Sequence, residues 1–140
     1  EALVGALAYT GLNLGDTFKI EATMTAHDDD SFGLIYSMQQ YDYAYRVRLD
    51  HERGFIRLEA LEFGTIHILA ERTDIDVPVG VPLTLTVERI GPLHIVHMDD
   101  TFLFQAYDTA LNSGSRLGFF TWAMNEAHFD SLRVTQPAGL

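Results

Sequence analysis

The stretch YAYRVRLDHERGFIRLEAL (residues 43–61) decides the fold class of this chain. In residues 43–50, apolar and polar side chains alternate with a period of two, which is the period of a β-strand with one buried face. Residues 55–61 repeat this alternation, and the tetrad HERG (51–54) between the two runs is typical of a turn. The stretch therefore predicts an antiparallel β-hairpin with one apolar face and one charged face.

The same alternation continues on both sides of the hairpin. Turn residues interrupt it at intervals of roughly 8–12 residues, as in a β-sandwich, and a helical period of hydrophobic residues is nearly absent. About eleven strands with few helices predict an all-β fold, a two-sheet antiparallel β-sandwich of the jelly-roll type. Besides the hairpin, the predicted strands include residues 18–24, 65–72, 83–90, 93–99, 101–108, 116–122 and 128–134.

Length and composition limit the classes of protein to consider. The 140 residues, of which 47% are hydrophobic, suit one domain, which we place at residues 1–134, with 135–140 as the start of a linker in a longer protein. The net charge of −11 disfavours nucleic acid and anionic membranes as partners. The absence of cysteine excludes disulfides and thiolate metal sites, and no apolar run approaches the ~20 residues that membrane insertion requires.

Three segments together resemble a known family. They are DDDSFGLIY (28–36), YAYRVRLDHERGFIRL (43–58) and SGSRLGFFTWAMNEAHFDSLRV (113–134), in this order. The combination resembles the concanavalin A-like lectin/glucanase superfamily, and within it the thrombospondin C-terminal, L-type lectin-like domain and its laminin-G-like relatives. The resemblance implies a curved jelly roll of an extracellular multidomain protein, often with bound calcium. It does not imply one activity, because a fold hosts many functions.

The sequence lacks the catalytic pattern that the resemblance would supply. Retaining glucanases of the superfamily carry glutamates that flank an aspartate on one strand face, and no such run occurs here. Glu59 and Glu62 are three residues apart, which places them on opposite faces of a strand. A glycoside hydrolase needs two carboxyl groups about 5–9 Å apart across one bond. We therefore predict no catalytic residue from the sequence.

The acidic run Asp28, Asp29 and Asp30 is a candidate calcium site. Calcium takes six to eight oxygen ligands, which loops supply from carboxylates and carbonyls. The resemblance implies that the last strand lies antiparallel beside the strand at 18–26, which would bring Asn125 and Glu126 opposite the three aspartates. These five residues are the predicted ligands of a calcium ion. A solvated acidic turn is the alternative.

A second candidate site is a shallow groove for a saccharide. Aromatic rings pack on the C–H faces of sugars, and polar side chains bind the hydroxyl groups. Tyr41 and Trp122 lie at predicted loop junctions, so they are the predicted stacking residues. Gln39, Gln40 and Asp42 beside Tyr41 are the predicted hydrogen-bonding residues.

The charged face of the hairpin allows two interpretations. Arg46, Arg48 and Arg57 point outward in the predicted strands, where they would bind the carboxylates of an acidic polysaccharide. Alternatively, they would pair with acidic side chains across strands, at little gain in stability for each pair. The candidates for this pairing are Asp50, Glu59 and Glu21.

The six histidines show no pair on one strand face, so a zinc site is not expected. His27 and His128 become neighbours if the first and last long strands are paired. Protonation of this pair would weaken a calcium site beside it.

The function that these features favour is a non-catalytic extracellular binding module of a larger secreted protein, with carbohydrate as the ligand and calcium ordering the loops. Two alternatives remain open. One is a structural or cell-adhesion domain that contacts a neighbouring extracellular protein domain, as in thrombospondin. The other is a hydrolase or lyase that acts on polysaccharides.

Overall fold

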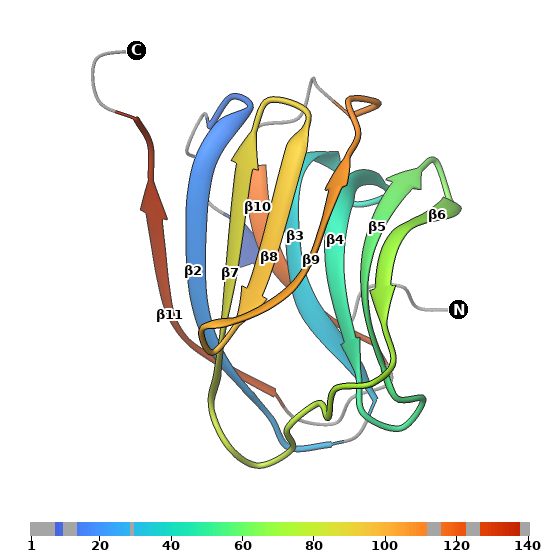
Figure 1. The fold of residues 1–140 in the computed structure, drawn as a ribbon, viewed down its shortest axis with the longest axis vertical. Coiled ribbons are helices and arrows are strands. Elements are labelled where there is room, and N and C mark those ends of the chain that lie inside the picture. The colour runs from blue at the N-terminus through green and yellow to red at the C-terminus, as the bar shows by residue number, and fades with distance from the viewer. Residues whose placement is uncertain (1–7, 10–13, 29, 112–115, 123–126, 138–140) are drawn as a thin grey trace.

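The computed structural model describes residues 8–9, 14–28, 30–111, 116–122 and 127–137, and this part of the chain consists of strands and turns without a helix. The strands form two antiparallel sheets that pack face to face (Figure 1). Sheet A has six strands in the order β1-β10-β3-β4-β5-β6, and sheet B has five in the order β11-β2-β7-β8-β9. The predicted two-sheet jelly-roll sandwich is confirmed. The strands are β1 (Ala8–Tyr9), β2 (Thr17–Ala26), β3 (Ser31–Gln40), β4 (Tyr43–Asp50), β5 (Phe55–Glu62), β6 (Thr65–Arg72), β7 (Leu83–Ile90), β8 (Leu93–Met98), β9 (Thr101–Tyr107), β10 (Arg116–Trp122) and β11 (Ala127–Thr135).

The hairpin β4–β5 forms as the alternation predicts. Its register runs without interruption from Tyr43 opposite Glu62 to Asp50 opposite Phe55. The turn between the strands closes through a hydrogen bond of 2.9 Å from the Gly54 amide to the Asp50 carbonyl oxygen. Gly54 has a φ of 74°, a backbone conformation that residues with a Cβ adopt only with strain.

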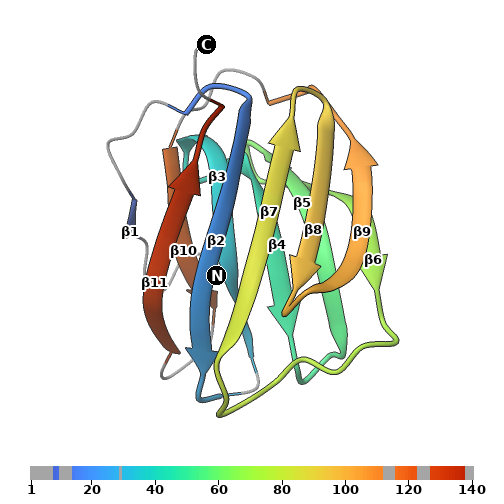
Figure 2. The same cartoon turned by 60° about the vertical axis from the view of Figure 1, so that its left-hand side comes forward.

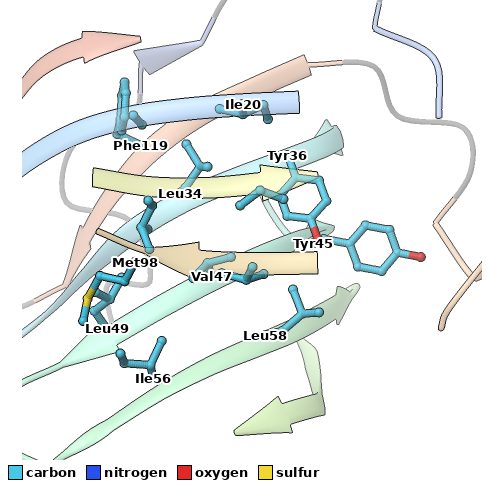
Figure 3. Packing of buried hydrophobic residues seen from close by; sticks show 14 of the residues in the cluster. Ile20, Leu34, Tyr36, Tyr45, Val47, Leu49, Ile56, Leu58, Met98 and Phe119 are labelled. Carbon is cyan, nitrogen blue, oxygen red and sulfur yellow. The ribbon is translucent and has the colours of Figure 1, made fainter. Parts of the chain in front are cut away.

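One face of each sheet builds the core between the sheets. Leu34, Val47 and Leu58, from three neighbouring strands of sheet A, are fully buried in the same apolar layer as Ile20 and Met98 of sheet B (Figure 3). These side chains occupy every second position of their strands, so the period of two in the sequence defines which face is buried. Removing this apolar surface from water is the main force that holds the two sheets together.

The first and last long strands lie side by side, as predicted. Strand β11 pairs with β2 from Ala127 opposite Ala26 to Thr135 opposite Lys19, and Figure 2 shows β11 at the edge of sheet B next to β2. The predicted linker begins at residue 135, where the structure still shows strand pairing. Beyond it, the Gln136 amide donates a hydrogen bond of 3.0 Å to the Leu14 carbonyl oxygen. In the described part of the chain, no helix has the length and apolarity that crossing a membrane requires.

The turn between β8 and β9 is formed by two aspartates. Asp99 and Asp100 both have positive φ, 50° and 71°, as the two central residues of a type I′ hairpin turn require. Asp99 also accepts a hydrogen bond of 2.8 Å from the Thr84 amide through its side chain. The Asp99 carboxylate therefore ties the turn to β7.

Gly33 is the point of closest approach between β3 and β4. A Cβ atom built on Gly33 would lie 1.9 Å from the carbonyl oxygen of Val47 and 3.1 Å from the ring of Phe120. The nearest atom belongs to the backbone of the neighbouring strand, so a larger residue at position 33 forces the two strands apart.

We expect Gly33→Ala to lower the free energy of unfolding by about 2 kcal/mol or more, because the methyl group overpacks the strand pair. Urea denaturation measures the loss. Gly80→Ala is the matched control, since Gly80 has a φ of 82° but open space around the Cβ position. Equal losses for the two variants would show that the close approach at Gly33 is not the cause.

Candidate functional site

The outward face of sheet A carries a row of charged side chains. The strand register places Arg48 beside Gly33 on one side and Arg57 on the other, and Arg57 beside Glu71. The adjacent row contains Arg46 beside Glu59. We call this surface the arginine face, and its members are Arg46, Arg48, Phe55, Arg57, Glu59 and Glu71.

The centre of the arginine face is a buried ion pair. Arg46 donates through Nε to Glu59 Oε1 at 2.7 Å, and the two side chains are 3% and 0% exposed. The guanidinium carbon of Arg46 also lies 4.7 Å from the centre of the Phe120 ring, a cation–π contact. A charge pair taken out of water tolerates only a well-defined geometry, so these contacts fix both side chains.

Phe55 orients the other two arginines. The guanidinium carbon of Arg57 lies 3.7 Å from the centre of the Phe55 ring and that of Arg48 lies 5.2 Å from it. Arg57 Nε donates to Glu71 Oε2 at 2.5 Å, and Arg48 Nε donates to Ser31 Oγ at 2.9 Å. Arg57 and Glu71 are 27% and 35% exposed, so they form the solvent-accessible rim of the face.

Asp50 connects the arginine face to the HERG turn. Its carboxylate accepts hydrogen bonds from Ser31 Oγ at 2.6 Å, the Arg53 amide at 2.7 Å and Arg53 Nη1 at 2.9 Å. Burial alone would raise the pKa of Asp50, but these hydrogen bonds outweigh it and hold the pKa below its usual value. The turn and the face are thus one hydrogen-bonded unit.

Glu59 retains an acceptor without a hydrogen-bond donor in the described part of the chain. Its Oε2 atom is buried and lies 3.7 Å from Arg48 Nη1, beyond hydrogen-bonding distance. Buried polar atoms are nearly always hydrogen-bonded, so this oxygen marks a place where a donor is missing.

The structure favours the pairing interpretation of the arginines. Arg46 and Arg57 each engage a carboxylate of the neighbouring strand. The prediction of Glu59 and Asp50 as pairing residues is confirmed. Glu21 was wrongly included, because it lies on sheet B beside Arg133, and Glu71 and Phe55 were missed. The register of three successive strands is the signal that places these residues next to the arginines.

The structure separates the predicted stacking residues. Trp122 pairs with Ser31, which is the first residue of β3. Tyr41 directly follows Gln40, which is the last residue of β3. The ten residues of β3 span about 30 Å at ~3.3 Å per residue. The prediction of one groove containing both Tyr41 and Trp122 is therefore wrong, because the two loop junctions lie at opposite ends of the sheet. The structure describes the strand position of Trp122 but not its side chain.

The predicted hydrogen-bonding residues surround Tyr41 at the β3–β4 turn. Tyr41 is 54% exposed, and Gln40 Nε2 donates to Asp42 Oδ1 at 2.7 Å. The carbonyl oxygen of Gln39 accepts a hydrogen bond from Arg116. These contacts brace the turn and leave the Tyr41 ring in solvent.

The geometry assumed for the calcium site is confirmed at the level of strand pairing. Because Ala127 pairs with Ala26 and Trp122 pairs with Ser31, the chain leaves β2 and enters β11 at the same end of the sandwich. Of the predicted ligands, the structure describes Asp28 and Asp30. Outside the described residues lie Asp29, Asn125 and Glu126.

The described residues at this end contain no group of three His, Cys, Asp or Glu side chains that would hold a metal. The rings of His27 and His128 are 4.6 Å apart, so their predicted proximity is confirmed. Calcium itself stays a prediction.

The predicted separation of Glu59 and Glu62 is also confirmed. Glu59 points to the arginine face, whereas Glu62 contacts His67 at 3.0 Å and is 37% exposed. The two carboxylates belong to different environments.

Sequence analysis missed a second polar cluster, which lies inside the sandwich. Tyr36 and His94 are fully buried, and the Tyr36 hydroxyl is 2.8 Å from His94 Nδ1. His94 Nε2 is 3.1 Å from the Asp108 carbonyl oxygen. A carbonyl oxygen only accepts, so Nε2 carries the proton and Nδ1 accepts from Tyr36.

The same cluster anchors the chain after β9. Tyr45 donates to Asp108 Oδ1 at 2.7 Å and accepts from the Leu111 amide at 3.2 Å. The buried Arg89 donates to Ser37 Oγ at 2.7 Å. Tyr36, Tyr45, Arg89 and His94 are buried, so we assign the cluster a structural role. The alternation placed Tyr45 on the buried face but did not show that it meets other polar groups there.

Comparison with known proteins identifies the fold. No protein-family model matches the sequence, and no curated protein matches it. Among solved structures, the carbohydrate-binding module CBM66 from Bacillus subtilis superposes with a TM-score of 0.80 at 19% identity, over 92% of this chain and 78% of that chain. Sheep galectin-11 superposes with a TM-score of 0.70 at 11% identity, over 96% of this chain and 99% of the galectin.

Caenorhabditis elegans galectin LEC-6 gives a TM-score of 0.71 at 11% identity, over 97% of this chain and 93% of that chain. The chain has a lectin-like jelly-roll fold. At these identities the likeness concerns the fold alone. The narrower resemblance to thrombospondin C-terminal and laminin-G-like domains stays a prediction.

We expect the buried imidazole of His94 to make the protein acid-sensitive. Burial lowers the pKa of His94 from 6.5 to about 4. Folding therefore favours the neutral imidazole, so its contribution is complete above pH 6.5 and is lost as the pH falls towards 4. The loss amounts to at most about 3 kcal/mol.

Urea denaturation across this pH range tests the prediction. His94→Gln should be less stable at neutral pH and should show a shallower fall in stability between pH 6.5 and 4 than the unsubstituted protein. His97→Gln, on the opposite face of the same strand, is the control. An unchanged slope in His94→Gln would refute the assignment.

Proposed function

We propose that this chain is a non-catalytic carbohydrate-binding module that binds a neutral saccharide on the arginine face. The observation that carries the proposal is the exposed rim of that face, where Arg57 and Glu71 are held in fixed orientation above the buried pair of Arg46 and Glu59. Fixed polar groups bind a ligand with little loss of side-chain entropy.

The chemistry of the face matches the two kinds of surface of a sugar ring. Hydroxyl groups both donate and accept, and the face offers guanidinium donors next to carboxylate acceptors. Ile66 and Ile68 lie on the same side of β6, 41% and 51% exposed, where they offer apolar contact to the C–H groups. The face would thus offer donors and acceptors to the hydroxyl groups of a sugar and apolar contact to its C–H groups.

Charge balance favours a neutral ligand over an acidic polysaccharide. Arg46 and Arg57 are paired with Glu59 and Glu71 on the same face. The third arginine, Arg48, lies 3.7 Å from a carboxylate oxygen of Glu59 and 3.9 Å from one of Asp50. The chain as a whole has a net charge of −11, which repels polyanions. The pairing also disfavours catalysis, since each of these carboxylates is already engaged by an arginine.

The relatives in fold agree with this proposal, since one of them is named as a carbohydrate-binding module. A single shallow face of this kind binds weakly, so tight attachment needs several copies or neighbouring domains. We therefore propose that the chain acts as an extracellular module of a larger secreted protein.

A glycan array followed by affinity electrophoresis in polysaccharide gels tests the function and its location. We expect binding to neutral glycans, with at least a tenfold loss of affinity in Arg57→Ala. Arg133→Ala is the matched control, because Arg133 is 80% exposed on β11 of sheet B. Binding that is equally reduced in both variants would place the site elsewhere, and a flat array with an intact fold would refute the function.

Calcium is a separate proposal that rests on the strand ends described above. If calcium bridges Asp28 and Asp30 to the other predicted ligands, then a hundredfold excess over its Kd stabilises the fold by about 2.7 kcal/mol. Thermal melting in calcium and in EGTA measures this shift. Asp30→Asn should abolish it and Asp16→Asn, at the other end of β2, should preserve it. Identical melting in calcium and EGTA would refute the site.

A further inference from the structure

The outward face of sheet B differs from the arginine face, because it carries exposed apolar side chains. The register aligns Ile90, Leu93 and Tyr107 in one row across three strands. Ile95 lies in the next row, and Phe102 lies in the row after that. Ile90, Phe102 and Tyr107 are 46%, 48% and 69% exposed. We call these five residues the apolar strip. Contiguous exposed apolar surface of this kind marks interaction sites.

A charged hollow adjoins the apolar strip. It has a volume of about 300 Å³ and is lined by Lys19, Glu21, Thr86, Glu88, His97 and Asp100. Three carboxylates and one ammonium group leave it with a net charge of −2 when the histidine is neutral. Glu88 lies directly beside Ile95 in the strand register, and the His97 ring contacts the Phe102 ring at 5.7 Å. The hollow and the strip are therefore one continuous surface.

We propose that this surface is a docking site for a protein segment that presents a lysine or arginine beside aliphatic side chains. The cation enters the acidic hollow, and the aliphatic side chains cover the apolar strip. Charge complementarity supports this partner, because both the hollow and the whole chain are negative.

Two other occupants fit less well. A second copy of this chain brings a further net charge of −11 and an equally acidic hollow, so the two copies repel each other. A saccharide needs hydrogen-bonding partners along its length, but three of the five side chains of the strip are aliphatic and offer none. A protein segment gains from burying them. The proposal goes beyond carbohydrate binding, since it concerns the opposite sheet.

Selection from a peptide library displayed on phage tests the proposal. The folded protein is the bait, and Glu88→Lys, which reverses the charge at the hollow, is used for counter-selection. We expect the enriched peptides to share a Lys or Arg flanked by aliphatic residues. The synthetic peptide should lose at least tenfold in affinity with Glu88→Lys and with Tyr107→Ser, and should keep its affinity for Arg57→Ala on the other sheet.

Several outcomes would overturn this inference. Peptides without a basic residue, or peptides that bind all variants equally, contradict it. So does concentration-dependent dimerisation that Tyr107→Ser abolishes, because the surface then binds a second copy. Glycan binding that is lost in Tyr107→Ser and retained in Arg57→Ala would assign the surface to a saccharide. Thermal melting of each variant confirms that the fold is intact.

Discussion

The buried ion pair between Arg46 and Glu59 constrains how β4 and β5 pair. Its atoms lie 2.7 Å apart and both side chains are almost fully buried, on the side of sheet A that faces away from the core. A slip of β5 by one residue against β4 would turn Glu59 towards the core, expose Leu58 and leave Arg46 without its partner. The cost of an unpaired buried charge thus reinforces the hydrophobic pattern. Arg57 and Glu71 lie in the neighbouring row of the same face, where Phe55 orients Arg57.

The two outward faces of the sandwich have different chemistry. On sheet A, guanidinium groups form ion pairs with carboxylates, which suits a ligand that both donates and accepts hydrogen bonds. On sheet B, an acidic hollow borders an apolar strip, which suits a cationic and apolar partner. Since the core separates the faces, the two proposed binding events need not compete. A module of this kind would connect a saccharide to a protein.

The candidate sites show where sequence reasoning succeeds and where it stops. The hairpin was predictable because alternation of apolar and charged residues is a local signal, and Tyr45, Val47 and Leu49 are buried as that alternation requires. The pairing of β2 with β11 followed from the resemblance and is confirmed. The prediction of a groove containing Tyr41 and Trp122 failed. Both residues lie at strand ends, and local sequence signals do not show which strand ends lie close together in the fold.

The sequence by itself determined the all-β class, the faces of the strands and the absence of a catalytic carboxylate pattern, because each depends on residues close together in the chain. Only the tertiary structure decided which side chains share a surface. Phe55 and Glu71 join the arginines through the register of β4, β5 and β6, and His94 reaches Tyr36 from the opposite sheet. Such contacts depend on how the sheets are ordered and packed. Alternation gives the same signal for any strand order, so it does not determine these contacts.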